Sequence, residues 1–189
     1  MDAGYIPVKW STGNEQRPLN PGQEDRMGKK EKEVKTNAMR ILEKEKIAYT
    51  SHTYECTEFT DGAQIADTLG LPHEKVYKTL VTVGKSKEHY VFVLAIDDEL
   101  DFKKSAKVAG EKSLEMLPLK ELTALTGYVR GGCTSIGMKK HFPTFFQESI
   151  TELETVLVSG GKLGLQLELK PADLIRAAGG ITADFIAER

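Results

Sequence analysis

The sequence predicts an α+β protein with a single domain, in which a mixed, largely antiparallel sheet is surrounded by helices. Three observations support this fold class. The chain of 189 residues has the length of one ordinary domain with one core. Segments with strand and helix patterns are interleaved along it. Two links between strands, residues 84–87 and 159–164, have the composition of hairpin turns, which argues against a doubly wound parallel sheet.

Composition excludes several classes of protein. Apolar residues make up 40% and charged residues 29% of the chain, which argues against a disordered protein. The longest apolar run, Tyr90–Ile96, is far shorter than the ~20 residues of a membrane helix. A net charge of −2 does not mark a nucleic-acid binder, although a local basic patch stays possible. The N-terminus lacks the pattern of a secretory signal and Cys56 and Cys133 are far apart, so we expect free thiols and a cytoplasmic location.

Residues 1–30 differ from the rest of the chain. They are rich in polar residues, proline and glycine and show no sustained period. We interpret them as a flexible tail or an extension, and residues 31–189 as the folded domain.

The first half of this domain shows local signals for each element. Apolar residues at Val34, Ala38, Ile41 and Leu42 predict an amphipathic helix that starts near Glu33. The next expected elements are a strand over 48–54, a helix over 61–70 with Asp61 as N-cap and Gly70 as its end, a strand over 76–84, and a central strand, buried on both faces, over 89–96.

The second half continues the alternation. A basic helix is expected over 101–110, a short strand over 113–116, and a helix over 117–127 that Gly127 ends. The expected elements after it are a strand running into a glycine-rich loop over 127–137, a strand–turn–strand unit over 155–169, and a helix over 170–180.

Lys78 is an anomaly within the stretch "EKVYKTLVTVG". The period of two places it on the same face as Val76 and Leu80. One interpretation is a lysine that extends its ammonium into water along an apolar surface. The other is a partly buried cation placed to meet an anion, such as a phosphate or a developing oxyanion.

Two glycine-rich turns are further candidate sites. "GGCTSIG" (131–137) could hold a carbonyl oxygen or a phosphate with backbone N–H groups, but taken alone a plain turn is the simpler interpretation. Its spacing does not complete a P-loop, because Met138 stands where the lysine belongs. "SGGKLG" (159–164) is most simply a hairpin turn.

Other reactive residues give weaker signals. Cys133 could act as a nucleophile, but no histidine is near it in sequence. The histidines show no metal-ligand spacing, so we expect neither a metal nor a cofactor. Basic clusters at 103–107 and 139–141 are most simply solvated faces, although a polyanion bound at the glycine loop would meet the second of them.

Taken together, "VYKTL", "DFKKSAKVAG", "GYVRGGCTSIGMKKHFPT" and "VSGGKLGLQLEL" resemble the YbaK/EbsC family, the free-standing relatives of the prolyl-tRNA synthetase editing domain. The resemblance runs from about Thr36 to the C-terminus. It implies the barrel-like fold of the prolyl-tRNA synthetase-associated domain. It also implies hydrolysis of mischarged tRNA(Pro), with Cys-tRNA(Pro) as the first expectation, Ala-tRNA(Pro) as the alternative, and attack by the thiol of the substrate.

The resemblance also implies roles for individual residues. Lys78 matches the essential lysine, which would hold the terminal adenosine and its phosphate or the ester region. Gly131 and Gly132 match glycines whose N–H groups face the scissile carbonyl. The residues expected to contact the substrate are Tyr54, Phe59, Thr79, Ser135, Gly160, Gly161 and Gln166.

Two positions depart from the family pattern, and both bear on function. Ser135 stands where a proline is usual, and Gln166 where the Cys-specific members commonly carry an acid. A binding module that grips a tRNA end without hydrolysis therefore remains an alternative, as does a partner protein that docks on prolyl-tRNA synthetase. No membrane partner is expected, and the oligomeric state is left open.

Overall fold

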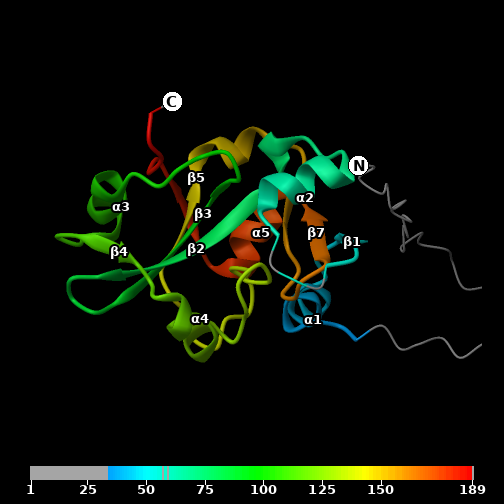
Figure 1. The fold of residues 1–189 in the computed structure, drawn as a ribbon, viewed down its shortest axis with the longest axis horizontal. Helices are drawn as coiled ribbons and strands as arrows, with labels where there is room; N and C mark the ends of the chain where they lie inside the picture. The colour runs from blue at the N-terminus through cyan, green and yellow to red at the C-terminus, as the bar shows by residue number, and fades with distance from the viewer. Residues whose placement is uncertain (1–33, 57, 59, 189) are drawn as a thin grey trace, which may run out of the picture.

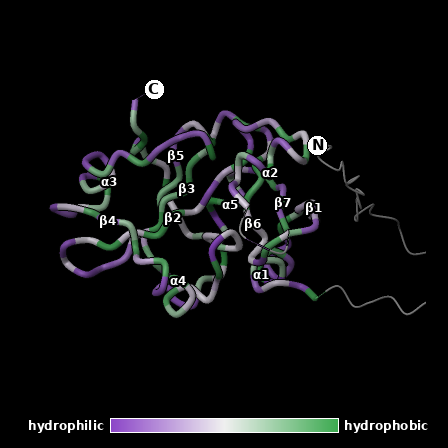
Figure 2. Tube along the Cα trace, viewed as in Figure 1, coloured by the Kyte–Doolittle hydropathy of each residue, from purple (hydrophilic) through white to green (hydrophobic). Residues whose placement is uncertain are grey.

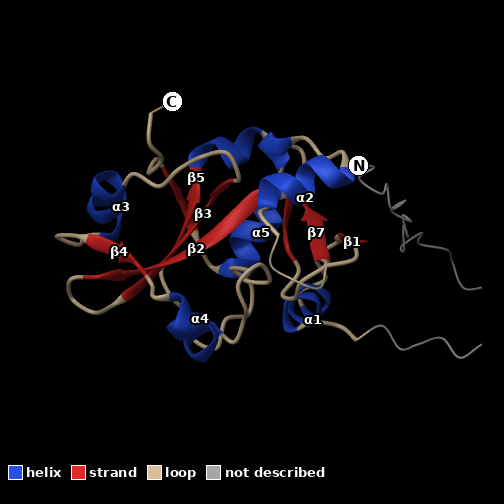
Figure 3. Cartoon of the chain, viewed as in Figure 1, coloured by secondary structure: helices blue, strands red, loops and turns tan. Residues whose placement is uncertain are grey.

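A computed structural model describes residues 34–56, 58 and 60–188 of the chain. Phe59 and the predicted tail at residues 1–30 lie outside these ranges. The described residues form five α-helices, eight strands and two short 3-10 helices, in an order that mixes helices and strands throughout (Figures 1 and 3). This arrangement confirms the α+β class.

The strands form two separate sheets. The larger sheet has the order β4-β2-β3-β5-β8, and the smaller one has the order β1-β7-β6. The larger sheet consists of β2 (Tyr77–Gly84), β3 (His89–Ala95), β4 (Leu114–Met116), β5 (Thr144–Gln147) and β8 (Ile181–Ala183). The smaller sheet consists of β1 (Thr50–Thr53), β6 (Val156–Ser159) and β7 (Leu165–Leu169).

The pairing of the strands is mixed and largely antiparallel, as predicted. The ladders β2–β3, β2–β4, β1–β7 and β6–β7 are antiparallel, and only β3–β5 and β5–β8 are parallel. The barrel-like closure is a wrong expectation. The two sheets meet through a bridge between Val76 and Leu157 and then diverge, so they do not close on each other.

The α-helices lie around the sheets. Their bounds are Asn37–Lys44 (α1), Gly62–Leu69 (α2), Phe102–Ala109 (α3), Leu119–Thr126 (α4) and Pro171–Ala178 (α5). The 3-10 helices are η1 (His73–Lys75) and η2 (Glu148–Glu152). None of the helices in the described ranges combines the length and the apolar character needed to cross a bilayer.

Local signals determine where two of these helices begin and end. Asp61 accepts a hydrogen bond from the N–H of Ala63, which makes it the N-cap of α2. Gly70 ends α2 in the left-handed conformation, with a φ of 62°. At α1 the prediction was less accurate, since the helix starts after Thr36, whose hydroxyl accepts from Met39, and Val34 is 74% exposed.

The main hydrophobic core joins the two sheets. It contains side chains of β2, β3 and β5 from the larger sheet, side chains of β6 and β7 from the smaller one, and residues of α1 and α5. Figure 2 shows hydrophobic residues along β2 and β3 and hydrophilic residues at the tip of the turn that links them. β3 is central and almost fully buried, as its apolar sequence predicts.

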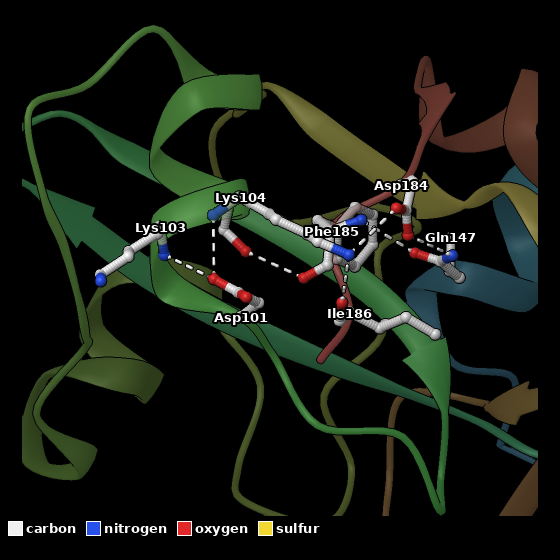
Figure 4. Close-up of polar contacts among 8 residues, drawn as sticks. Asp101, Lys103, Lys104, Gln147, Asp184, Phe185 and Ile186 are labelled. Atoms are coloured by element: carbon white, nitrogen blue, oxygen red, sulfur yellow. Dashed lines mark hydrogen bonds and ion pairs between the residues drawn. The ribbon is translucent and has the colours of Figure 1, made fainter. Parts of the chain in front are cut away.

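A second core lies on the other side of the larger sheet and includes the C-terminal strap (residues 184–187). The Phe185 ring is fully buried against Phe92, with ring centroids 4.9 Å apart. Lys104 on α3 forms an ion pair with Asp184 at 3.3 Å, and Gln147 donates to the same carboxylate at 3.0 Å (Figure 4). The strap is therefore held by both burial and polar contacts.

Two sequence expectations differ from the observed elements. The stretch before the glycine loop forms no strand, because residues 128–130 follow the end of α4 and turn directly into the loop. Conversely, β5 and β8 were not predicted. Their short runs lack alternation, and they are stabilised by parallel pairing with strands remote in sequence.

Candidate active site

A cavity of about 520 Å³ lies where the two sheets diverge. Its walls come from the start of α2, the first half of β2, the β4–α4 link, the glycine loop and the ends of β6 and β7. The polar and glycine residues that line it are Thr60, Asp61, Gly62, Lys78, Thr79, Arg130, Gly131, Cys133, Ser159 and Gln166. The apolar walls include Ile65, Val76, Leu80, Ile96, Met116, Leu117, Leu119 and Leu122.

Among the described residues, the cavity follows a stretch of β2 that has no paired strand on the side of β4. Alternate residues of an antiparallel strand point their backbone groups to the same side. The carbonyl of Val81 accepts from Leu117 N–H at 3.0 Å, where the pairing with β4 ends. Thr79, two residues earlier, points its backbone N–H and C=O to that same side. On this side β2 contacts β6 through the bridge between Val76 and Leu157 and pairs with β4 only from Thr82 on. Thr79 therefore lies in the gap between β4 and β6.

Lys78 is half-buried at the wall of this cavity. Its Nζ donates to the carbonyl of Ile96 at 2.9 Å. Burial lowers the pKa of Lys78, and nearby carboxylates, led by that of Asp61, oppose the shift and favour the ammonium form. The other carboxylates in this set belong to Asp97, Asp98 and Glu99. The lysine is tolerated in an apolar strand because a backbone carbonyl accepts its hydrogen bond, nearby carboxylates favour its charge and its side chain borders a cavity.

The glycine loop places Gly131, but not Gly132, along the cavity. Gly131 has a φ of 82°, a conformation that suits glycine. Gly132 is buried, and its N–H already donates to Val129 at 3.0 Å, so in this structure it does not point at a ligand. A Cβ on Gly132 would lie 3.0 Å from backbone atoms of Lys162. The absence of a side chain therefore lets the two glycine turns pack backbone against backbone.

Gln166 presents a buried amide to the same cavity. It lies on β7 between His52 of β1 and Ser159 of β6, and it is 6% exposed. Within the described part of the chain its Oε1 has no hydrogen-bond partner. Burial raises the pKa of Tyr54, and the Gln166 side chain opposes that rise. An unpartnered buried acceptor at a cavity wall is a group that a ligand donor can satisfy.

The remaining predicted residues are not gathered in the cavity. Gly160 and Gly161 form the neighbouring turn, where Gly160 O accepts from the Thr36 hydroxyl at 2.6 Å. Ser135 lies outside it and lines a separate cavity of about 130 Å³ together with Lys140 and His141. Tyr54 is beside Gln166 rather than on the cavity wall.

Several lining residues were missed by sequence reasoning. Asp61 was recognised only as a helix cap, and Ser159 only as part of a turn. Met116, Leu119 and Arg130 carry no motif that distinguishes them from ordinary surface residues. The spacing of Asp61 and Lys78 gives no signal either, because the fold brings them together across α2 and η1.

The chemistry of the wall is electrostatic rather than nucleophilic. Burial raises the pKa of Cys133 to about 12, so this thiol is not ionised near neutral pH. The described residues that line the cavity include no histidine that could activate a hydroxyl. No group of three or more described metal-ligating side chains is arranged to hold a metal ion. The site offers a cation, backbone groups and a buried amide.

Comparison with known proteins identifies the family. A family model described as the aminoacyl-tRNA editing domain matches residues 58–177. A protein of Enterococcus faecalis named as a candidate Cys-tRNA(Pro)/Cys-tRNA(Cys) deacylase, EbsC, is 43% identical over 160 residues, which cover 84% of this chain and 98% of that protein. The uncharacterized protein YwhH of Bacillus subtilis is 28% identical over 124 residues, which cover 64% of this chain and 78% of that protein.

A solved structure agrees in fold. The crystal structure of a candidate trans-editing enzyme for prolyl-tRNA synthetase superposes with a TM-score of 0.69 at 22% identity, covering 82% of this chain and all of the other. This match confirms the expected α+β fold with mixed sheets, and the EbsC match spans nearly the whole relative. The chain therefore belongs to the aminoacyl-tRNA editing domain family.

Proposed function

We propose that this protein hydrolyses mischarged aminoacyl-tRNA, with cysteine attached to tRNA(Pro) as its substrate. The observation that carries the proposal is the cavity itself, where half-buried Lys78 lies with Gly131 and Gln166 and where the described lining residues include no activated nucleophile. The name of EbsC, at 43% identity over most of both chains, points to the same substrate class.

The reaction we propose uses the substrate's own thiol. The sulfur attacks the ester carbonyl carbon, the bond to the ribose oxygen breaks, and the proton released by the thiol passes to that oxygen. Water then opens the resulting four-membered thiolactone to give free cysteine. Lys78 stabilises the negative charge that develops on the ester oxygens, and Gln166 Oε1 accepts a hydrogen bond from the substrate ammonium.

This mechanism favours cysteine over alanine as the amino acid. Alanine has no internal nucleophile, so its ester needs an activated water molecule. The described residues along the cavity wall include no histidine that could act as the base. Alanyl-tRNA is therefore the less suitable substrate.

The protein is proposed to act in the cytoplasm, where mischarged tRNA arises. The cavity is small relative to a tRNA, and the net charge of −2 offers little general attraction to a polyanion. We infer that selection of tRNA(Pro) depends on a partner such as prolyl-tRNA synthetase.

The test is deacylation of matched substrates by the purified protein. We expect hydrolysis of cysteinyl-tRNA(Pro) but not of seryl-tRNA(Pro), whose hydroxyl replaces the thiol. Lys78→Ala is expected to lower kcat/KM roughly 100-fold, because removing one group that stabilises the oxyanion has about that effect. Lys107→Ala on α3 serves as the matched control.

Two results would contradict the proposal. Equal hydrolysis of the seryl and cysteinyl esters would exclude attack by the substrate thiol. Tight binding of cysteinyl-tRNA(Pro) without any turnover would indicate the binding module instead.

A further inference from the structure

Two large apolar side chains are exposed at the edge of the cavity. Met116, the last residue of β4, is 44% exposed, and Leu119, the first residue of α4, is 54% exposed. Both belong to the cavity lining, together with Leu122, which lies one turn after Leu119 on α4. We call these three residues the apolar shelf.

The apolar shelf indicates a ligand contact because its exposed side chains lie together at one cavity. Single exposed apolar residues are normal on protein surfaces. Here, however, two of the six large hydrophobic side chains exposed among the described residues line the same cavity. Between them Leu117 is only 8% exposed, and it both packs in the main core and lines the cavity. Apolar surface gathered at a cavity mouth is typical of a ligand contact.

The size of the cavity leaves room for a ligand larger than an amino acid. Its volume of about 520 Å³ falls within the ~300–1,000 Å³ of sites that enclose drug-sized molecules. A cysteinyl group fills only part of that space. In the proposed reaction the ester joins this group to a ribose that carries a nucleobase, so the nucleoside must occupy the space next to the ester.

We propose that the apolar shelf holds the terminal adenine base of the substrate, an assignment that rests on the proposed function. The base would lie on the side chains of Leu119 and Leu122, and the thioether of Met116 would contact its ring, a favourable pairing of sulfur with an aromatic system. Arg130 also lines the cavity and contributes positive charge for the phosphate that precedes the nucleoside.

The experiment measures binding of adenosine 5′-monophosphate, which requires no hydrolysis. NMR titration of the wild-type protein is compared with titration of the double variant Met116→Ala/Leu119→Ala. Because the contact removed is largely apolar, we expect a loss of affinity of roughly tenfold. Ribose 5-phosphate, which lacks the base, is expected to bind the two proteins equally. Both side chains are exposed, so the variant should fold normally.

Ile181→Ala is the matched control. Ile181 is 61% exposed on β8, at the opposite edge of the larger sheet from β4, and its removal should leave binding of the nucleotide unchanged. Unchanged affinity of the shelf variant for the nucleotide would overturn the proposal, as would an equal loss for ribose 5-phosphate. Nucleotide binding that depends on the shelf, in a protein without deacylase activity, would support the shelf and contradict the proposed reaction.

Discussion

Lys78 shows how one residue acquires its chemistry from the fold around it. Its charge is disfavoured by burial, and the carbonyl of Ile96 and the acidic residues near it compensate. A fully exposed lysine would be hydrated, and a fully buried one would tend to lose its proton. Half-burial beside these acids leaves a cation on the cavity wall that a substrate oxyanion can approach.

Cys133 provides a prediction at the same scale. We expect Cys133→Ala to retain deacylase activity within roughly threefold, because a thiol whose pKa is raised to about 12 is a poor nucleophile. The measurement is single-turnover hydrolysis of cysteinyl-tRNA(Pro). A loss of about 100-fold or more would instead assign the nucleophile to the protein.

Some residues of the candidate site could be predicted from the sequence and others could not, and the reason differs from residue to residue. Lys78 could be singled out because it is a charge within an apolar strand, and Gly131 because it belongs to a cluster of glycines. Met116 and Leu119 could not be predicted, because the exposure of their side chains depends on where the fold places the end of β4 and the start of α4. Ser135 was placed in the site by its loop, but the loop turns after Cys133 and directs it into the smaller cavity.

At the level of elements, the glycine turns at residues 131–137 and 159–164 pack against each other and together form one wall of the cavity. Gly132→Ala is expected to destabilise the protein by ~1–3 kcal/mol, because its Cβ would press on the backbone at Lys162. It should also lower kcat/KM, since the same turn carries Gly131. Thermal unfolding and deacylation would be measured together.

Gly110→Ala is the comparison for this variant. Gly110 has a φ of 73° and open space where a Cβ would lie. An alanine there would therefore destabilise the protein only through its unfavourable backbone conformation, by ~1–2 kcal/mol. It lies at the end of α3, away from the cavity lining, and activity should not change. A Gly132→Ala protein as active and as stable as wild type would show that the turns do not need this close approach.

Helix α2 is attached through a histidine whose two ring nitrogens both contact carboxylates. His73 Nε2 lies 2.8 Å from Asp67 on α2, and Nδ1 lies 2.9 Å from Asp97. Only the protonated ring donates to both. The pKa of His73 is accordingly raised, first by Asp97 and then by Asp67.

The sign of the pH dependence follows from that shift. A raised folded-state pKa means that the stabilisation is complete below the ordinary histidine value of ~6.5 and is lost as pH rises through the folded-state value. The protection of the α2 amides relative to their intrinsic, base-catalysed exchange rate should therefore fall above that point, and Asp67→Asn should lower the pKa of His73. NMR titration of the ring measures the pKa, and a midpoint at or below ~6.5 would contradict the raised value. Hydrogen exchange at a series of pH values measures the protection of α2.

For the whole molecule, the architecture was predictable wherever signals are local. The caps at Asp61 and Gly70 and the two hairpins allowed α2, β2, β3, β6 and β7 to be placed. The division into two sheets was not predictable, because it depends on pairing between remote segments. The short strand β5 lies between β3 and β8, and nothing in its four residues indicates those neighbours.

The C-terminal strap gives a prediction at this scale. Phe185→Ala should lower the free energy of unfolding by ~3–5 kcal/mol, because it empties a fully buried site in the second core. Urea denaturation measures the change. Phe102→Ala is the control, since Phe102 is 42% exposed and should cost much less. A change below ~1 kcal/mol for Phe185→Ala would mean that the strap is not part of the cooperative core.

The pairing of β1 with β7 has a consequence for biosynthesis. Thr50 lies opposite Glu168, so the smaller sheet joins segments separated by most of the chain. Contacts of such long range form late, and a nascent chain on the ribosome does not have them until β7 has emerged. Gln166 arrives with that strand, whereas Lys78 is made much earlier. An incomplete nascent chain therefore displays the lysine without its cavity, and the complete cavity can form only after β7 has been synthesised.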